Sequence, residues 1–307
     1  MDAICSPSPV TNLGSTHMVR TLLIRGMLIG FVAGLLAFGF AKLFGEPQID
    51  RAIAFEDQMN QAKGEDPETE IVSRAVQSSI GLFIGVVVYG SALGGLFALV
   101  FAFVYGRAGR LSPRGTAALL ACAGFVAIVV APALKYPPNP PAVGEPETIG
   151  YRTEVYFLMI SISIIALIAA MTIRRRLIGR FGSWNATLVG AAGFIVIVAV
   201  AQLLLPSINE VPDQFPAVVL WRFRIASLGI EFVLWTVIGV LFGIVAERVL
   251  AEQYRCVSPA LRQNEASISF TRSNSYRFSA KETRRKILFS KLYQKLLLAV
   301  SFRRTRL

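Results

Sequence analysis

A group of carboxylates follows the first apolar stretch of this 307-residue chain, with a spacing that could gather a metal cation. Glu46, Asp50 and Asp57 are separated by four and seven residues, so a continuous helix would place all three on one face. Pro47 suits the first position of such a helix, and Glu56 adds a fourth carboxylate. Oxygen ligands are adequate for a hard or borderline divalent ion, although they select weakly. The alternative is a solvated acidic helix in a loop outside the membrane.

A further candidate ligand is Glu231, which lies inside a strongly apolar stretch. A carboxylate within a membrane-crossing helix is costly and marks a functional site. Gln202, in another apolar stretch, is a milder polar partner. Alternatively, Glu231 lies near the membrane boundary and pairs with Arg222 or with Arg224, which is seven residues away on the same helical face. The sequence leaves both interpretations open.

A proline-rich loop occupies the middle of the chain. Its candidate site residues are Lys135, Tyr136, Pro137, Pro138, Asn139, Pro140 and Pro141. Four prolines in five residues exclude a helix, so the segment must lie outside the hydrocarbon or be enclosed by protein. The lysine and tyrosine suit a membrane interface, and the asparagine and carbonyl oxygens are acceptors that could line an entrance. The alternative is a rigid lid or a partner-docking surface.

Six apolar segments are expected to position these residues by crossing a membrane as helices. They are Leu22–Phe44, Ile80–Tyr105, Ala117–Leu134, Val155–Ile173, Leu188–Leu205 and Ile225–Ala246. Each has about the 17–25 residues that span a hydrocarbon core. The third to fifth are at the short end, so a five-span count stays open. The predicted fold class is an all-α, polytopic transmembrane helix bundle, and glycines at every fourth position, as in Gly26, Gly30 and Gly34, predict close helix packing.

Loop charge predicts the orientation of this bundle. Arginines precede the first span and fill the connections between the second and third and between the fourth and fifth spans. The remaining loops hold 13 of the 19 acidic residues. By the positive-inside rule, both termini are then cytoplasmic. The acidic segment after the first span, the proline loop and the loop around residues 209–216 lie together on the outer side, where they could form a metal-gathering vestibule.

Composition and charge separate a membrane body from a basic tail. The chain is 54% hydrophobic and 16% charged, which is too few charges for a soluble domain. After Ala246 there are 14 Lys/Arg against 4 Asp/Glu, so most of the +12 net charge belongs to the tail and predicts contact with membrane lipid, not with nucleic acid. Residues 1–17 are expected to be a disordered extension or to precede a true start at Met18. Residues 18–250 form the transmembrane domain and 251–307 a basic cytoplasmic tail. Within that tail, Lys281–Arg306 is either an interfacial helix or a poorly ordered extension.

Motifs of enzymes are absent from the sequence. It contains no GxxxxGK[ST], GxSxG or HExxH. The three cysteines, Cys5, Cys122 and Cys256, are scattered and offer no paired metal site. Neither an enzyme nor a permanently bound cofactor is therefore expected.

Three segments resemble the CbtA family of proposed cobalt transporter subunits. They are GEPQIDRAIAFE at 45–56, LKYPPNPPAVG at 134–144 and LPSINEVP at 205–212, within a similarity from about Met18 to about Leu250. The resemblance implies a bacterial inner-membrane protein that imports Co²⁺ for cobalamin biosynthesis. It also implies a partner, CbtB, a small single-span subunit that bears histidines; a homo-oligomer is compatible as well. The family is usually described with five spans, whereas the charge pattern here favours six.

The histidine content bears on how such a subunit would work. The only histidine, His17, precedes the family-like region, and Co²⁺ favours imidazole and oxygen ligands. Nitrogen ligands would therefore come from the partner, or the ion path would use carboxylates and carbonyls alone. The rival interpretation is a non-transporting membrane scaffold or regulatory subunit, in which the proline loop docks a partner.

Overall fold

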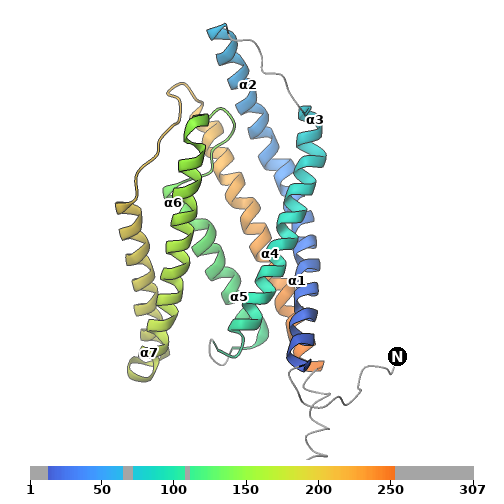
Figure 1. Ribbon diagram of the computed structural model, residues 1–307, viewed down its shortest axis with the longest axis vertical. Coiled ribbons are helices and arrows are strands. Elements are labelled where there is room, and N and C mark those ends of the chain that lie inside the picture. The colour runs from blue at the N-terminus through green and yellow to red at the C-terminus, as the bar shows by residue number, and fades with distance from the viewer. Residues whose placement is uncertain (1–12, 65–71, 108–110, 253–307) are drawn as a thin grey trace, which may run out of the picture. The chain divides into compact units, whose positions relative to one another are not determined.

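The computed structural model describes residues 13–64, 72–107 and 111–252, and every regular element among them is a helix (Figure 1). The predictions for residues 1–12 and for the basic tail, including its interfacial helix, fall outside the described residues. Five of the described helices are long and apolar enough to cross a membrane: Met18–Lys63, Arg74–Val104, Pro113–Lys135, Pro146–Leu204 and Ala217–Glu252. The chain is thus a multi-pass, all-helical membrane protein.

The first long helix combines an apolar and a polar part. α1 (Leu13–Phe40) passes through a π-helical turn, η1 (Ala41–Gly45), into α2 (Glu46–Lys63), without leaving helical dihedral angles. Pro47 stands in the first turn of α2 and supplies no N–H to the preceding turn, and the π turn η1 directly before it accommodates this loss. The condition for a shared carboxylate face, a helix that continues through the acidic segment, is therefore met.

The second long helix packs against α1 at very short range. It consists of α3 (Arg74–Val76), the π turn η2 (Gln77–Gly81) and α4 (Leu82–Val104). A Cβ atom added to Gly30 would lie 2.1 Å from the carbonyl oxygen of Gly90, and one added to Gly94 would lie 2.2 Å from that of Gly26. The predicted small-residue packing is confirmed, since only glycine lets the two backbones approach this closely.

The third long helix changes its winding at a proline. α5 (Pro113–Gly124) begins where Ser112 accepts a hydrogen bond from the amide of Gly115, and it continues through the π turn η3 (Phe125–Val130) into α6 (Ala131–Lys135). Pro132 is buried and has no N–H for the preceding turn. The π turn directly before it redistributes the hydrogen bonds of that stretch.

The fourth long element is a helical hairpin. α7 (Ile149–Leu204), which follows the short helix η4 (Pro146–Thr148), carries a non-helical residue, Gly182, with φ 78° and ψ 167°. Arg174 Nε donates a hydrogen bond of 2.9 Å to Thr187 Oγ1, and a Cβ on Gly190 would lie 2.9 Å from Ala170 O. In a straight helix, residues 20 positions apart would be separated by about 30 Å. The chain therefore folds back at Gly182, and α7 supplies two of the six apolar segments that the sequence predicts (Figure 1).

The C-terminal helix, Ala217–Glu252, links the two sides of the bundle. The ring of Phe242 in this helix contacts two rings of α4. Its centroid lies 5.3 Å from that of Phe97 and 5.0 Å from that of Phe101. Toward the other side, a Cβ on Gly124 of α5 would lie 2.3 Å from the Trp235 ring. The α7 hairpin then packs on α6 and η3 through the buried residues Ala131, Met159, Ala166, Val198 and Ala201.

The helices alternate in direction, so their connections divide between two ends (Figure 1). At one end, Arg175 Nη2 donates a hydrogen bond to the carbonyl of Arg107, and Arg114 pairs with Glu247. The arginine-bearing connections thus meet at one end, in agreement with the charge pattern; which side of the membrane they face stays a prediction. The other end carries α2 and the connections 136–148 and 205–216, and is called the loop end below.

Candidate functional site

Three segments from distant parts of the chain meet at the loop end. Ala52 of α2, Val143 of the proline loop and Phe215 of the last connection form one buried apolar cluster. The rings of Phe55 and Phe215 meet edge to face, with centroids 5.1 Å apart. These are the three segments that the sequence places on one side of the membrane, and the structure brings them into contact.

The proline loop is tied to the 205–216 connection by hydrogen bonds. Lys135 Nζ donates to Ser207 Oγ at 3.0 Å, and Tyr136 Oη donates to the carbonyl of Pro206 at 2.9 Å. The prolines leave carbonyl oxygens without helical N–H donors. The side chains of Lys135 and Tyr136 hold the proline loop to the 205–216 connection. The proline loop is therefore held in a defined conformation against the 205–216 connection.

A second tie centres on Glu210. Its Oε2 accepts a hydrogen bond of 3.0 Å from the amide of Glu145 and lies 3.3 Å from Nη1 of Arg152. The Thr148 hydroxyl, followed by the Glu145 amide and the Arg152 guanidinium, holds the pKa of Glu210 below its ordinary value. Gly144 makes room for this arrangement, since it has φ 113° and its Cβ would lie 1.8 Å from Nη1 of Arg152.

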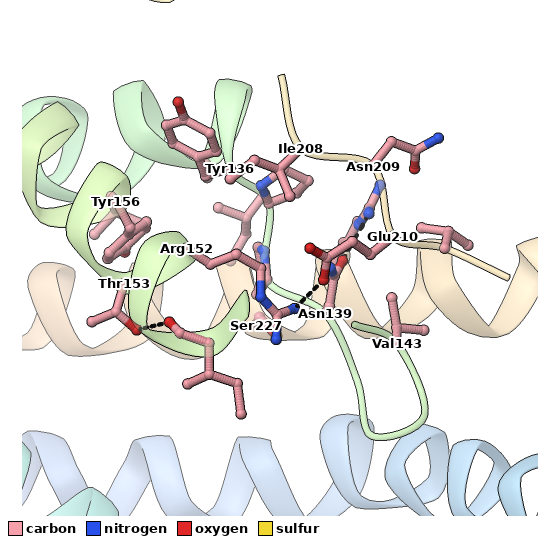
Figure 2. Close-up of a pocket in the computed structure, with 18 of the residues that line it drawn as sticks. Tyr136, Asn139, Val143, Arg152, Thr153, Tyr156, Ile208, Asn209, Glu210 and Ser227 are labelled. Carbon is pink, nitrogen blue, oxygen red and sulfur yellow. Dashed lines mark hydrogen bonds and ion pairs between the residues drawn. The ribbon is translucent and has the colours of Figure 1, made fainter. Parts of the chain in front are cut away.

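Beneath these ties is a cavity of about 620 Å³. Its wall is formed by η3, α6, the proline loop, the first limb of α7, the 205–216 connection and the C-terminal helix. Figure 2 shows Arg152 and Tyr156 entering from α7, with Glu210 opposite Arg152. The charged groups on the wall are Arg152, Glu210, Arg224 and Glu231. A cavity of this size is in the range of small-molecule sites.

Arg224 stands on the first turns of the C-terminal helix, on the cavity wall. Its Nη2 donates a hydrogen bond of 2.9 Å to Oδ1 of Asn139 in the proline loop. Its Nε is buried without a hydrogen-bond partner, and no carboxylate of the described residues forms an ion pair with it. The guanidinium is thus fixed in position while its charge stays uncompensated.

Glu231 lies deeper along the same helix. Seven residues separate it from Arg224, which corresponds to about 10 Å along the axis. Its Oε2 is buried without a hydrogen-bond partner, and so is Nε1 of Trp235. The Tyr89 hydroxyl and the Trp235 indole are its polar neighbours. The alternative interpretation, a pairing with Arg222 or Arg224, has no salt bridge among the described residues. The side chain of Gln202 donates a hydrogen bond to the carbonyl of Ala131.

The carboxylates of α2 have a different environment. Glu46 is buried and Asp50 exposed, and both bind the guanidinium of Arg74, Asp50 at 3.0 Å. The helical spacing thus brings the two together as expected, but around an arginine. Glu56 is half-buried and Asp57 exposed further along α2. Their role as metal ligands stays a prediction.

The structure therefore joins only part of the predicted site. Glu231 and the proline-loop residues Tyr136, Pro137, Pro138 and Asn139 line one cavity, whereas the α2 carboxylates do not. Arg152 and Glu210 were not identified from the sequence as cavity residues. The signal that could have indicated them is their position: each is a charged residue a few positions from the end of an apolar span. Within the described residues, no three His, Cys, Asp or Glu side chains come together closely enough to hold a metal ion.

Comparison with known proteins agrees with this architecture. A family model described as "Probable cobalt transporter subunit (CbtA)" matches residues 19–247. Searches of curated proteins and of solved structures found no match. The family match covers most of the chain and leaves out only the first residue of the first membrane helix and the last five of the last one. The chain therefore belongs to the CbtA family.

Proposed function

From membership in the CbtA family, we propose that this chain is the membrane subunit that moves a divalent metal ion, cobalt, across the bacterial inner membrane for cobalamin biosynthesis. The observation that carries the proposal is the family match over residues 19–247. The cavity at the loop end supports it, since a carboxylate of a membrane helix, Glu231, lines this cavity with one buried oxygen. The role is transport, without covalent chemistry on a substrate.

The proposed ion path runs from the loop end through the cavity to Glu231. The loop end is the outer side if the predicted orientation is right. An ionisable group inside a membrane helix is retained where it serves an ion pathway. Glu231 has the required features, because it lies in a membrane helix, lines the cavity and has a buried oxygen without a partner.

A partner is part of the proposal. Cobalt(II) binds imidazole well, but the single histidine of the chain, His17, precedes the matched region. A small single-span subunit with histidines, of the CbtB kind, would supply the nitrogen ligands. The description of the family as a transporter subunit agrees with a role in a complex.

Uptake of radioactive Co²⁺ tests this proposal. Cells without their own cobalt importer would express this chain alone, the partner alone, or both, at matched levels. Uptake that rises only when this chain is present is the expected result. Uptake that is the same with and without the chain would refute the proposal.

The rival function, a non-transporting scaffold, is favoured by the fixed conformation of the proline loop. Hydrogen bonds from Lys135 and Tyr136 hold that loop as a stable surface. A scaffold predicts that changes within Pro137–Pro141 abolish assembly with the partner while Glu46, Asp50 and Glu231 tolerate alanine. Co-purification of the partner with the loop variants, together with Co²⁺ uptake by the carboxylate variants, separates the two functions; retained uptake by Glu231→Ala favours the scaffold.

A further inference from the structure

Two charged groups of the C-terminal helix that line the cavity, Arg224 and Glu231, give it opposite charges at two depths. Arg152 and Glu210 neutralise each other across 3.3 Å. What remains is the guanidinium of Arg224 nearer the helix start and the carboxylate of Glu231 about two turns deeper. Neither has an ion-pair partner among the described residues.

The unsatisfied atoms of the wall define what a ligand must offer. Nε of Arg152 and Nε of Arg224 are buried donors without acceptors, and Oε2 of Glu231 is a buried acceptor without a donor or cation. Buried charged groups gain most from charge-assisted bonds to an oppositely charged partner. A ligand with anionic oxygens at one end and a cation at the other would satisfy both sets.

A bare metal ion meets only half of this requirement. An uncompensated arginine on the wall repels a free divalent cation. The volume argues in the same direction: a cation with six waters, at about 30 Å³ each, needs about 200 Å³. The cavity of about 620 Å³ holds considerably more than that.

We infer that the cavity binds the metal as a complex with a small oxyanion chelator, with the chelator's oxygens on Arg224 and the metal toward Glu231. This inference rests on the proposed function and adds to it the chemical class of the substrate. Guanidinium groups recognise carboxylate and phosphate oxygens alike, so both chelator chemistries are compatible with the wall. Asn139 fixes the Arg224 side chain through Oδ1 and so orients it for this contact.

Binding to the full-length chain in lipid nanodiscs tests the inference. The probes are Co²⁺ as chloride, citrate, pyrophosphate, and Co²⁺ premixed with either chelator, measured by calorimetry at one pH. The complex of Co²⁺ with at least one chelator should bind at least about tenfold tighter than Co²⁺ alone and than that chelator alone. This comparison needs no variant, so it stands even where a substitution prevents folding. The chelator that gives the gain identifies carboxylate or phosphate as the partner chemistry.

Two variants with a matched control locate the contacts. Arg224→Gln should lose at least about tenfold in affinity for the complex, because a charge-assisted bond is removed. Glu231→Gln should weaken binding of the complex and of Co²⁺ alone. Arg222→Gln is the control, since Arg222 is on the same helix but exposed and outside the cavity wall. It should bind every probe as the unchanged chain does.

Two results would overturn the inference. One is equal affinity for Co²⁺ alone and for its complexes, with Arg224→Gln behaving as Arg222→Gln does. The other is tight binding of a chelator without metal. Either result leaves the proposed function intact as long as cellular Co²⁺ uptake depends on the chain; loss of that dependence is what would remove the proposed function.

Discussion

Replacing Gly30 by alanine should weaken the packing of α1 against α4. The added Cβ would lie 2.1 Å from the carbonyl oxygen of Gly90 and 3.0 Å from Cα of Gly94. Real Cβ atoms essentially never approach another atom within 3.0 Å. Both obstructing atoms belong to backbone, so no side-chain rotation relieves the clash, and the two helices must part locally by about 1 Å.

The size of the effect follows from two opposing terms. Overpacking of this kind costs about 1–3 kcal/mol. Alanine in place of glycine in a helix gains up to about 1 kcal/mol wherever space allows. Gly39, also on α1, has open space around it. The variant Gly39→Ala therefore shows the gain in helix stability without the overpacking cost. Gly30→Ala should therefore be less stable than Gly39→Ala by about 1–3 kcal/mol, which lowers the melting temperature by about 2–12 °C.

Thermal unfolding of the purified variants in the same detergent measures this difference. The readout is the midpoint of unfolding followed by circular dichroism, at equal protein and detergent concentration. Gly85→Ala is a second control on α4, where the added Cβ likewise meets nothing. If Gly30→Ala unfolds at the same temperature as both controls, the close approach of α1 and α4 is wrong.

Three further predictions use the same unfolding assay. Gly144→Ala places a Cβ 1.8 Å from Arg152 at a positive φ, so it should lower the midpoint, whereas Gly150→Ala, with open space around it, should not. The pKa of Glu210 is lowered in the folded chain, first by the Thr148 hydroxyl; its stabilising effect is therefore complete above the ordinary value of about 4 and is lost as the pH falls through the lower folded value. Glu210→Gln should remove that part of the acid sensitivity between pH 7 and pH 3, and an unchanged pH profile would contradict it. Arg74→Gln leaves the buried Glu46 carboxylate without its cation and should cost about 1–3 kcal/mol, which a second change, Glu46→Gln, should largely restore.

The number of helices, and which connections share an end of the bundle, were predictable because both depend on local composition. Apolar runs of membrane-spanning length and arginine-rich connections are visible without any tertiary contact. The count of six apolar segments agrees with the structure once the α7 hairpin is recognised at Gly182. Glycine spacing likewise predicted close helix packing, since close approach in a membrane requires small residues at that period, and the structure shows it between α1 and α4.

The cavity was not predictable, because its wall joins residues that are distant in sequence. Arg152 lies in the first turn of α7 and Glu210 in the 205–216 connection, and only the tertiary fold brings them within 3.3 Å. The same limit applies to Glu46 and Asp50: their spacing gives a shared face, but the arginine that occupies that face, Arg74, comes from the next helix.

These environments rank the predicted metal ligands. A cation that approaches Asp50 must compete with the Arg74 guanidinium at 3.0 Å, whereas Glu231 has no cationic partner among the described salt bridges and lines the cavity. Loss of one charged ligand from a buried site costs about 1.5–3 kcal/mol, or roughly 10- to 150-fold. Glu231→Gln should therefore lower Co²⁺ uptake at least about tenfold.

Matched variants separate this ligand role from a general need for acidic residues. Asp50→Asn and Glu154→Gln, both exposed positions outside the cavity wall, should leave uptake within about twofold, which is the change expected from a minor surface interaction. Chain abundance in the membrane, measured by immunoblot, corrects each uptake rate. If Asp50→Asn abolishes uptake and Glu231→Gln does not, the ion binds along α2, and the cavity is not its path.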